Sequence, residues 1–257
     1  MLYAWLNCVC VMTQWQCKTE AIMKILVLGG TGATGKLAVQ QLLKQGHEVV
    51  LLIRKGRGAS ITPHECLEVI EETVLSIKQQ ALIALLASCD GVISCLGHNL
   101  TWRGVYGAPQ MLVRDSIRRV SESLDSSRQQ PMRLALMNTT GNRNLDLSEP
   151  VSFTQHCVLA LLRLFLPPHL DNERAANYLR TQQKNNPFLE WVVVRPDGLI
   201  DESDVSAFSL HESPIRSAIF DAGQTSRMNV ANLMVRLLSE KQLWQTWKGK
   251  MPVIYND

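Results

Sequence analysis

Short apolar runs alternate with segments of helical periodicity along most of the chain. The first run, Ile25 to Leu28, precedes apolar positions at helical spacing over 37–45, and a second run follows over 48–53. Continuous apolar runs are typical of strands buried on both faces of a parallel sheet, which is built from strand–helix–strand units. The pattern predicts further strands over 67–75, 91–96, 134–137, 191–194 and 253–255, and helices over 79–87, 111–124, 171–183 and 230–238. It therefore predicts an α/β protein with a doubly wound parallel sheet in one domain, 23–257.

Three segments do not fit this alternation. Pro167 and Pro168, and the Ser-, Asp- and Glu-rich stretch 201–213, are predicted to be loops over the top of the site. Residues 1–22 precede Met23, which lies directly before the first strand, so we expect them to form an extension outside the fold. This extension lacks a basic leading segment and Asn7 breaks its apolar run, which predicts neither a signal peptide nor a membrane span.

Glycines cluster between the first strand and the first helix, in the segment Gly29-Gly30-Thr31-Gly32-Ala33-Thr34-Gly35. Gly30, Gly32 and Gly35 fit the pattern G-x-G-x-x-G, in which the glycines permit a sharp turn, close approach of a pyrophosphate and close helix–strand packing. Such a turn directs a helix N-terminus at an anion. A glycine-rich turn without a ligand is the alternative. A nucleoside-triphosphate loop is disfavoured because Leu37 stands where a magnesium-binding hydroxyl is required.

Basic residues follow the second predicted strand, in Ile53-Arg54-Lys55-Gly56-Arg57. An NAD site carries an acidic residue near this point for the ribose 2′-hydroxyl, whereas an NADP site places an arginine there for the 2′-phosphate. Arg54 is best placed for a bidentate contact with that phosphate. We therefore predict NADP as the cofactor, with NAD possible; a solvated basic loop is the alternative.

These features together resemble the atypical short-chain dehydrogenase/reductase family, including its NmrA-like and flavin-reductase-like branches, over most of 23–255. The resemblance rests on the glycine segment, Arg54, and the segments Asp90 to Gly97 and Val192 to Leu199. It implies a Rossmann-type fold, with 94–97 beneath the cofactor ribose and the Arg195-Pro196 segment near the nicotinamide. The residues expected to bind the cofactor are Gly29, Gly30, Thr31, Gly32, Ala33, Thr34, Gly35, Arg54, Lys55, Leu96 and Gly97.

The catalytic residues are harder to predict. The wider family uses a Tyr-x-x-x-Lys pair as its proton donor, and none of the tyrosines here has a lysine four residues on. Thr139 and Thr140 occupy the family's serine position, where a hydroxyl could hold a substrate carbonyl or could satisfy backbone groups instead. His98 follows the fourth strand at the edge where ligands bind. A flavin or tetrapyrrole acceptor could draw its proton from water.

Composition and charge limit the ligands and partners that the chain is expected to bind. The formal net charge of +3 is too small to indicate nucleic-acid binding, because the basic and acidic residues are interspersed. The cysteines are scattered without zinc-binding spacing, which favours reduced thiols in a cytoplasmic protein and predicts no metal site. We expect a small-molecule substrate and no membrane partner.

Three function classes stay open. The first is an NADP-dependent reductase of a planar or quinone-like acceptor. The second is a redox-sensing regulator that binds the dinucleotide without turnover and acts on a protein partner. The third, disfavoured by the intact glycines and Arg54, is an assembly factor that keeps only the scaffold.

Overall fold

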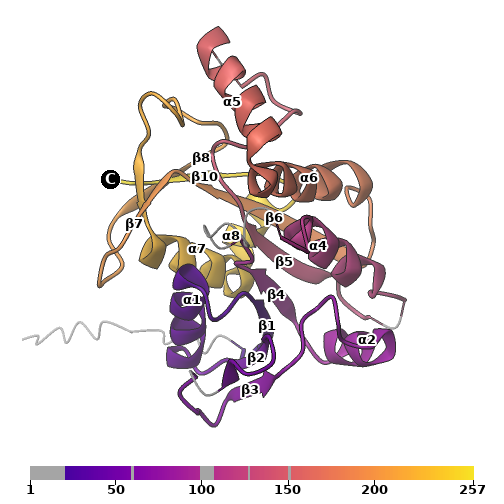
Figure 1. Cartoon of the computed structure of the whole chain (residues 1–257). Coiled ribbons are helices and arrows are strands. Elements are labelled where there is room, and N and C mark those ends of the chain that lie inside the picture. The colour runs from indigo at the N-terminus through magenta and orange to yellow at the C-terminus, as the bar shows by residue number, and fades with distance from the viewer. Residues whose placement is uncertain (1–20, 59–60, 99–106, 127, 150–151) are drawn as a thin grey trace, which may run out of the picture.

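An eight-stranded sheet lies at the centre of the described part of the chain (Figure 1). The structure is a computed structural model that describes residues 21–58, 61–98, 107–126, 128–149 and 152–257. The strand order is β3-β2-β1-β4-β5-β6-β10-β8, and all neighbouring pairs are parallel except β10 and β8. The strands are β1 (Lys24–Leu28), β2 (Glu48–Leu52), β3 (Leu67–Ile70), β4 (Gly91–Ser94), β5 (Met132–Met137), β6 (Leu189–Pro196), β8 (Phe208–His211) and β10 (Val253–Asn256). The predicted α/β fold with a doubly wound parallel sheet is confirmed.

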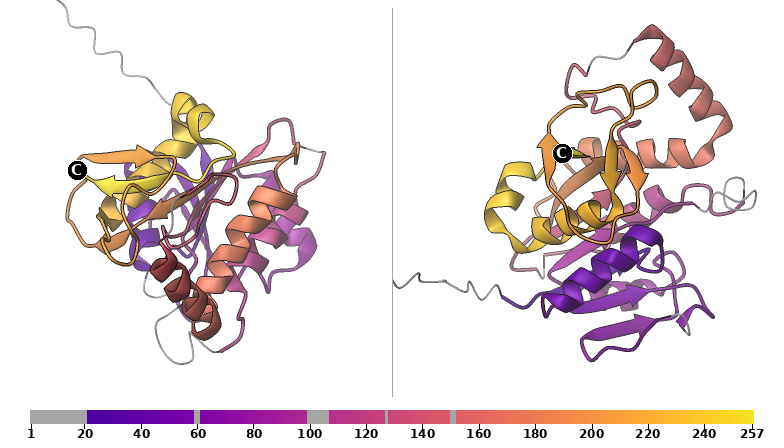
Figure 2. Two further views of the ribbon diagram at one scale, coloured as in Figure 1. Left: turned by 90° about the horizontal axis from the view of Figure 1, so that it is seen from above. Right: turned by 90° about the vertical axis from the view of Figure 1, so that its left-hand side faces the viewer.

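Helices cover both faces of this sheet (Figures 1 and 2). One face packs against α2 (Gln79–Ala87), α4 (Leu112–Glu122) and α6 (Pro167–Gln182), and the other packs against α1 (Ala33–Lys44), α7 (Arg227–Ser239) and α8 (Lys241–Trp247). Strand β1 contributes Leu26 and Leu28 to the first core, and Ile25 and Val27 to the second. These residues are all at most 2% exposed, which explains the unbroken apolar runs in the sequence.

Two features lie beside this three-layer body. Helix α5 (Phe153–Phe165) contacts α6 but stands clear of the layers, at the top of Figure 1 and of the right-hand view in Figure 2. Strands β7 (Gly198–Ile200) and β9 (Gln224–Ser226) form a small separate parallel sheet. The apolar pattern predicted neither α5 nor α8.

Both loop predictions were wrong in part. Pro167 and Pro168 begin α6, because proline at the first helical positions removes no intrahelical hydrogen bond. The stretch 201–213 contains β8, which pairs antiparallel to β10 through Tyr255 and its neighbours. The third strand ends at Ile70 rather than residue 75, because Thr73 and Ser76 form a hydrogen-bonded turn.

The proposed extension over 1–22 falls almost entirely outside the described residues and stays a prediction. Within the part of the chain that is described, no helix is both long and apolar enough to span a membrane.

Candidate functional site

The glycine segment forms a tight turn between β1 and α1. Gly29 has φ +77°, and a Cβ at this position would lie 2.6 Å from the carbonyl oxygen of Cys95. The Gly32 N–H donates to the Gly29 oxygen at 2.9 Å and closes the turn. A Cβ on Gly35 would lie 2.2 Å from that same oxygen. The sharp turn therefore falls at Gly29 and not at Gly30 as the motif predicted, whereas the close-packing role of Gly35 is confirmed.

Helix α1 begins directly after this turn without a capping side chain. Gly32 is the N-cap residue, and the first turn contains no acidic residue. The first N–H groups of a helix have no intrahelical acceptor, and the helix dipole adds positive potential at this end. Thr31, Gly32 and Ala33 are exposed there. The cradle therefore fits a diphosphate.

The strand register brings the other predicted cofactor residues to the same edge of the sheet. Leu28 at the end of β1 pairs with Leu52 of β2 and Ser94 of β4. The segments that follow these strands, 53–55 and 95–97, therefore emerge beside the turn. Arg54 and Lys55 are exposed, as is Gly97. The glycine turn lies at this edge, where β1 and β4 are neighbours. The strand order reverses direction between these two strands, and ligands bind at this point in such folds.

A cavity of about 350 Å³ opens beside the turn. Gly30 and Thr31 line it together with apolar side chains such as Val39 and Leu51. Lys36 also lines it, and this side chain is exposed without a hydrogen bond or ion pair to the other described residues. Lys36, the residue before Leu37, is a further cation for an anionic ligand.

Glu71 fixes the loop that carries the predicted NADP-specific cations. Its carboxylate accepts hydrogen bonds from the Gly56 N–H at 3.2 Å and the Gly58 N–H at 3.0 Å. The sequence around Arg54 contains no acidic residue, but folding brings this one in from the end of β3. These two hydrogen bonds tie the loop to the end of β3, beside the turn.

His98 is buried against Asp171 of α6. Its Nε2 lies 2.8 Å from Asp171 Oδ2, and the side chains are 4% and 0% exposed. The Asp171 carboxylate also accepts the Val113 N–H at 2.8 Å and the Arg114 N–H at 2.9 Å, which caps the N-terminus of α4. This arrangement fixes the ring beside the ligand edge. Asn99, also a candidate pocket residue by its place after β4, lies outside the described residues.

The two threonines after β5 have different surroundings. Thr140 is buried, and its hydroxyl donates to Asp197 Oδ1 at 3.0 Å, while Asp197 Oδ2 accepts the Gly223 N–H at 2.8 Å. This hydroxyl therefore ties β5 to the segment after β6. The Thr139 hydroxyl oxygen accepts the Gly141 N–H at 3.3 Å and retains its own proton for donation. Of the two, Thr139 is the one that can contact a substrate oxygen.

Two other functional groups near this edge, the Arg195 guanidinium and the Cys95 thiol, are not available for catalysis. The Arg195 side chain is fully buried, donates to the main-chain oxygens of Asn142 and Met251, and pairs with Glu149 at 2.7 Å. Burial raises the pKa of the Cys95 thiol to about 12. Arg195 is thus a structural residue, and Cys95 stays protonated near neutral pH. No cluster of three metal-ligating side chains occurs among the described residues.

Comparisons with known proteins give the family of the chain. A family model described as NAD(P)H-binding matches residues 29–241. The chain is 35% identical over 71 residues to the Photosystem II assembly factor Ycf39 of Synechocystis, a match that covers 28% of this chain and only 21% of that protein.

Among solved structures, a candidate NADH-flavin reductase from Streptococcus pneumoniae is similar with a TM-score of 0.62 and 18% identity, covering 91% of this chain and 100% of that one. A wide-type short-chain dehydrogenase/reductase from Veillonella parvula, solved with NADP, has a TM-score of 0.63 and 16% identity, covering 92% and 95%. At these identities the likeness shows the fold alone. The family model covers most of the chain, which therefore belongs to the NAD(P)H-binding family.

Proposed function

We propose that this protein is an NADP(H)-dependent reductase of a planar small-molecule acceptor such as a flavin or quinone. The observation that carries the cofactor choice is the pair of exposed cations, Arg54 and Lys55, at the end of β2. An NAD site would need an acceptor for the ribose 2′-hydroxyl at this position. The acidic residue that folding brings near this loop, Glu71, accepts the amides of Gly56 and Gly58, which follow the two cations.

Different residues of the chain would bind the cofactor and orient the acceptor. N–H groups of the turn and of the start of α1 would hold the diphosphate, and the Arg54 guanidinium would bind the 2′-phosphate. A reduced nicotinamide, when bound, supplies a hydride. Thr139 would donate to an oxygen of the acceptor and orient it. The missing tyrosine–lysine pair favours an acceptor whose proton comes from water, rather than an ordinary alcohol or ketone.

A redox-sensing regulator is the second candidate. It is supported by the same missing pair and by the engagement of the Thr140 hydroxyl with Asp197. Such a protein would bind the dinucleotide and act on a protein partner without hydride transfer. The free thiols of Cys66 and Cys89 support a reducing, cytoplasmic setting for either candidate.

Turnover separates the two candidates. Purified protein is incubated with NADPH and a panel of flavins, quinones and aldehydes, and absorbance of the reduced nicotinamide is followed. The reductase proposal predicts oxidation above background with at least one flavin or quinone and with no aldehyde. Tight NADPH binding without oxidation by any acceptor would refute the reductase and favour the regulator.

A further inference from the structure

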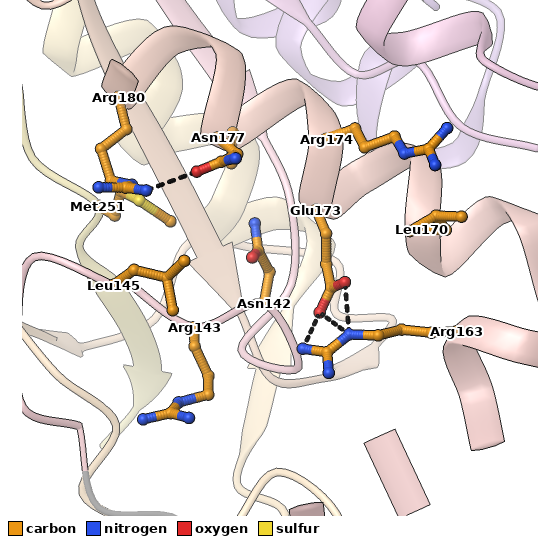
Figure 3. Close-up of a pocket in the computed structure, with 11 residues that line it drawn as sticks. Asn142, Arg143, Leu145, Arg163, Leu170, Glu173, Arg174, Asn177, Arg180 and Met251 are labelled. Carbon is orange, nitrogen blue, oxygen red and sulfur yellow. Dashed lines mark hydrogen bonds and ion pairs between the residues drawn. The ribbon is translucent and has the colours of Figure 1, made fainter. Parts of the chain in front are cut away.

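A second cavity, of about 160 Å³, lies between α6, the loop after β5 and Arg163 of α5 (Figure 3). The loop after β5 also carries the candidate substrate hydroxyl of Thr139. Asn142 lines the cavity and follows Thr139 by three residues. A Cβ on Gly141 would lie 3.7 Å from Thr139 Oγ1 and 3.4 Å from His169 Cε1. Thr139 and the cavity-lining residue Asn142 therefore lie on the same short loop, beside His169 of α6.

Arginines dominate the lining of the cavity, and two of them are neutralised. Arg163 donates three hydrogen bonds of 2.8 to 3.1 Å to the Glu173 carboxylate. His169 Nε2 lies 3.4 Å from the same carboxylate. Burial raises the pKa of Glu173, but the contacts with His169 and Arg163 outweigh it and lower the pKa to about 2. Arg180 pairs with Asp146 at 2.5 Å.

The other two arginines have no carboxylate partner among the described residues. Arg143 donates from Nη2 to the main-chain oxygen of Glu149 at 3.0 Å, and its Nε is buried without an acceptor. Arg174 is exposed, and among the described residues its side chain hydrogen-bonds to the Met111 sulfur, at 3.6 Å. The cavity and its rim therefore carry a surplus of two positive charges, and one buried donor lacks an acceptor, which is a costly state without a ligand.

We propose that this cavity binds the anionic tail, a phosphate or carboxylate, of the acceptor that the enzyme reduces. The inference rests on the proposed reductase function and narrows its substrate to planar acceptors with an anionic side chain. In the view of Figure 3, Asn142 and Glu173 lie between Arg143 and Arg174, whose guanidinium groups are directed outward from the central residues. Guanidinium groups bind phosphate and carboxylate oxygens through paired N–H donors. Arg174 is exposed on α6, so its long side chain can turn toward an anion while the helix stays in place.

The test compares two flavins that differ only in a phosphate. Flavin mononucleotide and riboflavin are titrated against protein saturated with NADP⁺, which occupies the glycine turn and allows no hydride transfer. Flavin fluorescence reports binding. We expect flavin mononucleotide to bind about tenfold more tightly than riboflavin, the size of one lost charged contact. The double variant Arg143→Met/Arg174→Met should bring the two affinities to near equality.

A matched control removes the same charge elsewhere. Arg118 and Arg216 form surface ion pairs with Glu122 and Asp221 outside the cavity, so Arg118→Met/Arg216→Met should keep the tenfold preference. Equal affinity of the parent protein for the two flavins, or an unchanged preference in the cavity variant, would overturn the proposal.

A competition measurement uses the parent protein alone, so its result does not depend on whether a variant folds. Millimolar inorganic pyrophosphate should displace flavin mononucleotide from the NADP⁺-saturated protein and leave riboflavin affinity unchanged. Failure to displace flavin mononucleotide would also refute the anion site. A parent protein that prefers flavin mononucleotide but oxidises no NADPH would refute the reductase function and leave the anion site intact.

Discussion

Replacing Gly35 with alanine tests the architecture of the dinucleotide turn. A Cβ at this position would lie 2.2 Å from the Gly29 oxygen, 2.8 Å from the Gly29 carbonyl carbon and 2.9 Å from Gly30 Cα. All three contacts are with backbone, so no side-chain rotation relieves them. Since ordinary contact begins at 3.4 Å, the turn must move by about 1 Å. Overpacking of this kind costs about 1–3 kcal/mol of stability.

The effect on cofactor binding should be larger than the effect on stability. Moving the turn by about 1 Å lengthens its hydrogen bonds to the diphosphate beyond the useful range. Losing two charge-assisted bonds of about 1.5 kcal/mol each lowers NADPH affinity about 150-fold. Isothermal titration calorimetry measures the affinity, and thermal unfolding measures the stability of the same sample.

Gly46→Ala is the matched control. Gly46 has φ +79° after α1, at the end far from the turn, and no atom lies within 4 Å of its Cβ position. This substitution should cost about 1–2 kcal/mol of stability through backbone strain and leave NADPH affinity unchanged. A folded Gly35→Ala protein that binds NADPH as tightly as the parent would refute the assigned role of the turn.

Three further predictions concern single side chains. Arg54→Ala should weaken NADPH binding by roughly 1.5–3 kcal/mol and leave NADH binding unchanged in calorimetry, and equal losses for both would refute its role at the 2′-phosphate. Thr140→Val should lower the free energy of unfolding by about 1–2 kcal/mol, because Asp197 loses a partly buried hydrogen bond, whereas Thr139→Val should lower turnover and leave stability nearly unchanged. Glu173 has a folded pKa of about 2, below its ordinary value near 4.5, so its contribution to stability is present above pH 4.5 and lost as the pH falls toward 2. Urea unfolding should show that Glu173→Gln costs roughly 2 kcal/mol at pH 7 and much less near pH 2; a cost independent of pH would contradict this pairing.

Local sequence features were sufficient for much of the fold. Residues 24–53 carry their strand, turn and helix signals within a short stretch, because β1 and β2 are buried on both faces and the intervening glycines have no substitute in the turn. The helix over 79–87 was predicted to the residue. Prolines misled the prediction at 167–168 because they are equally compatible with a loop and with the first turn of a helix.

The fixed side chains of the site could not be read from the sequence, because their partners are distant along the chain. His98 and Asp171 are 73 residues apart, and Thr140 and Asp197 are 57 apart. Residues this far apart are not linked by any periodic spacing, so a single sequence does not show that they are partners. Glu71 gave no signal either, because its partners are the backbone amides of Gly56 and Gly58 rather than side chains.

Calorimetric titration of the parent protein with NADPH and with NADH tests the central claim most directly. The geometry of the turn, with Arg54 and Lys55 exposed beside it, predicts one site per chain that binds NADPH more tightly than NADH. No measurable heat with either nucleotide at millimolar concentration would contradict the dinucleotide site itself.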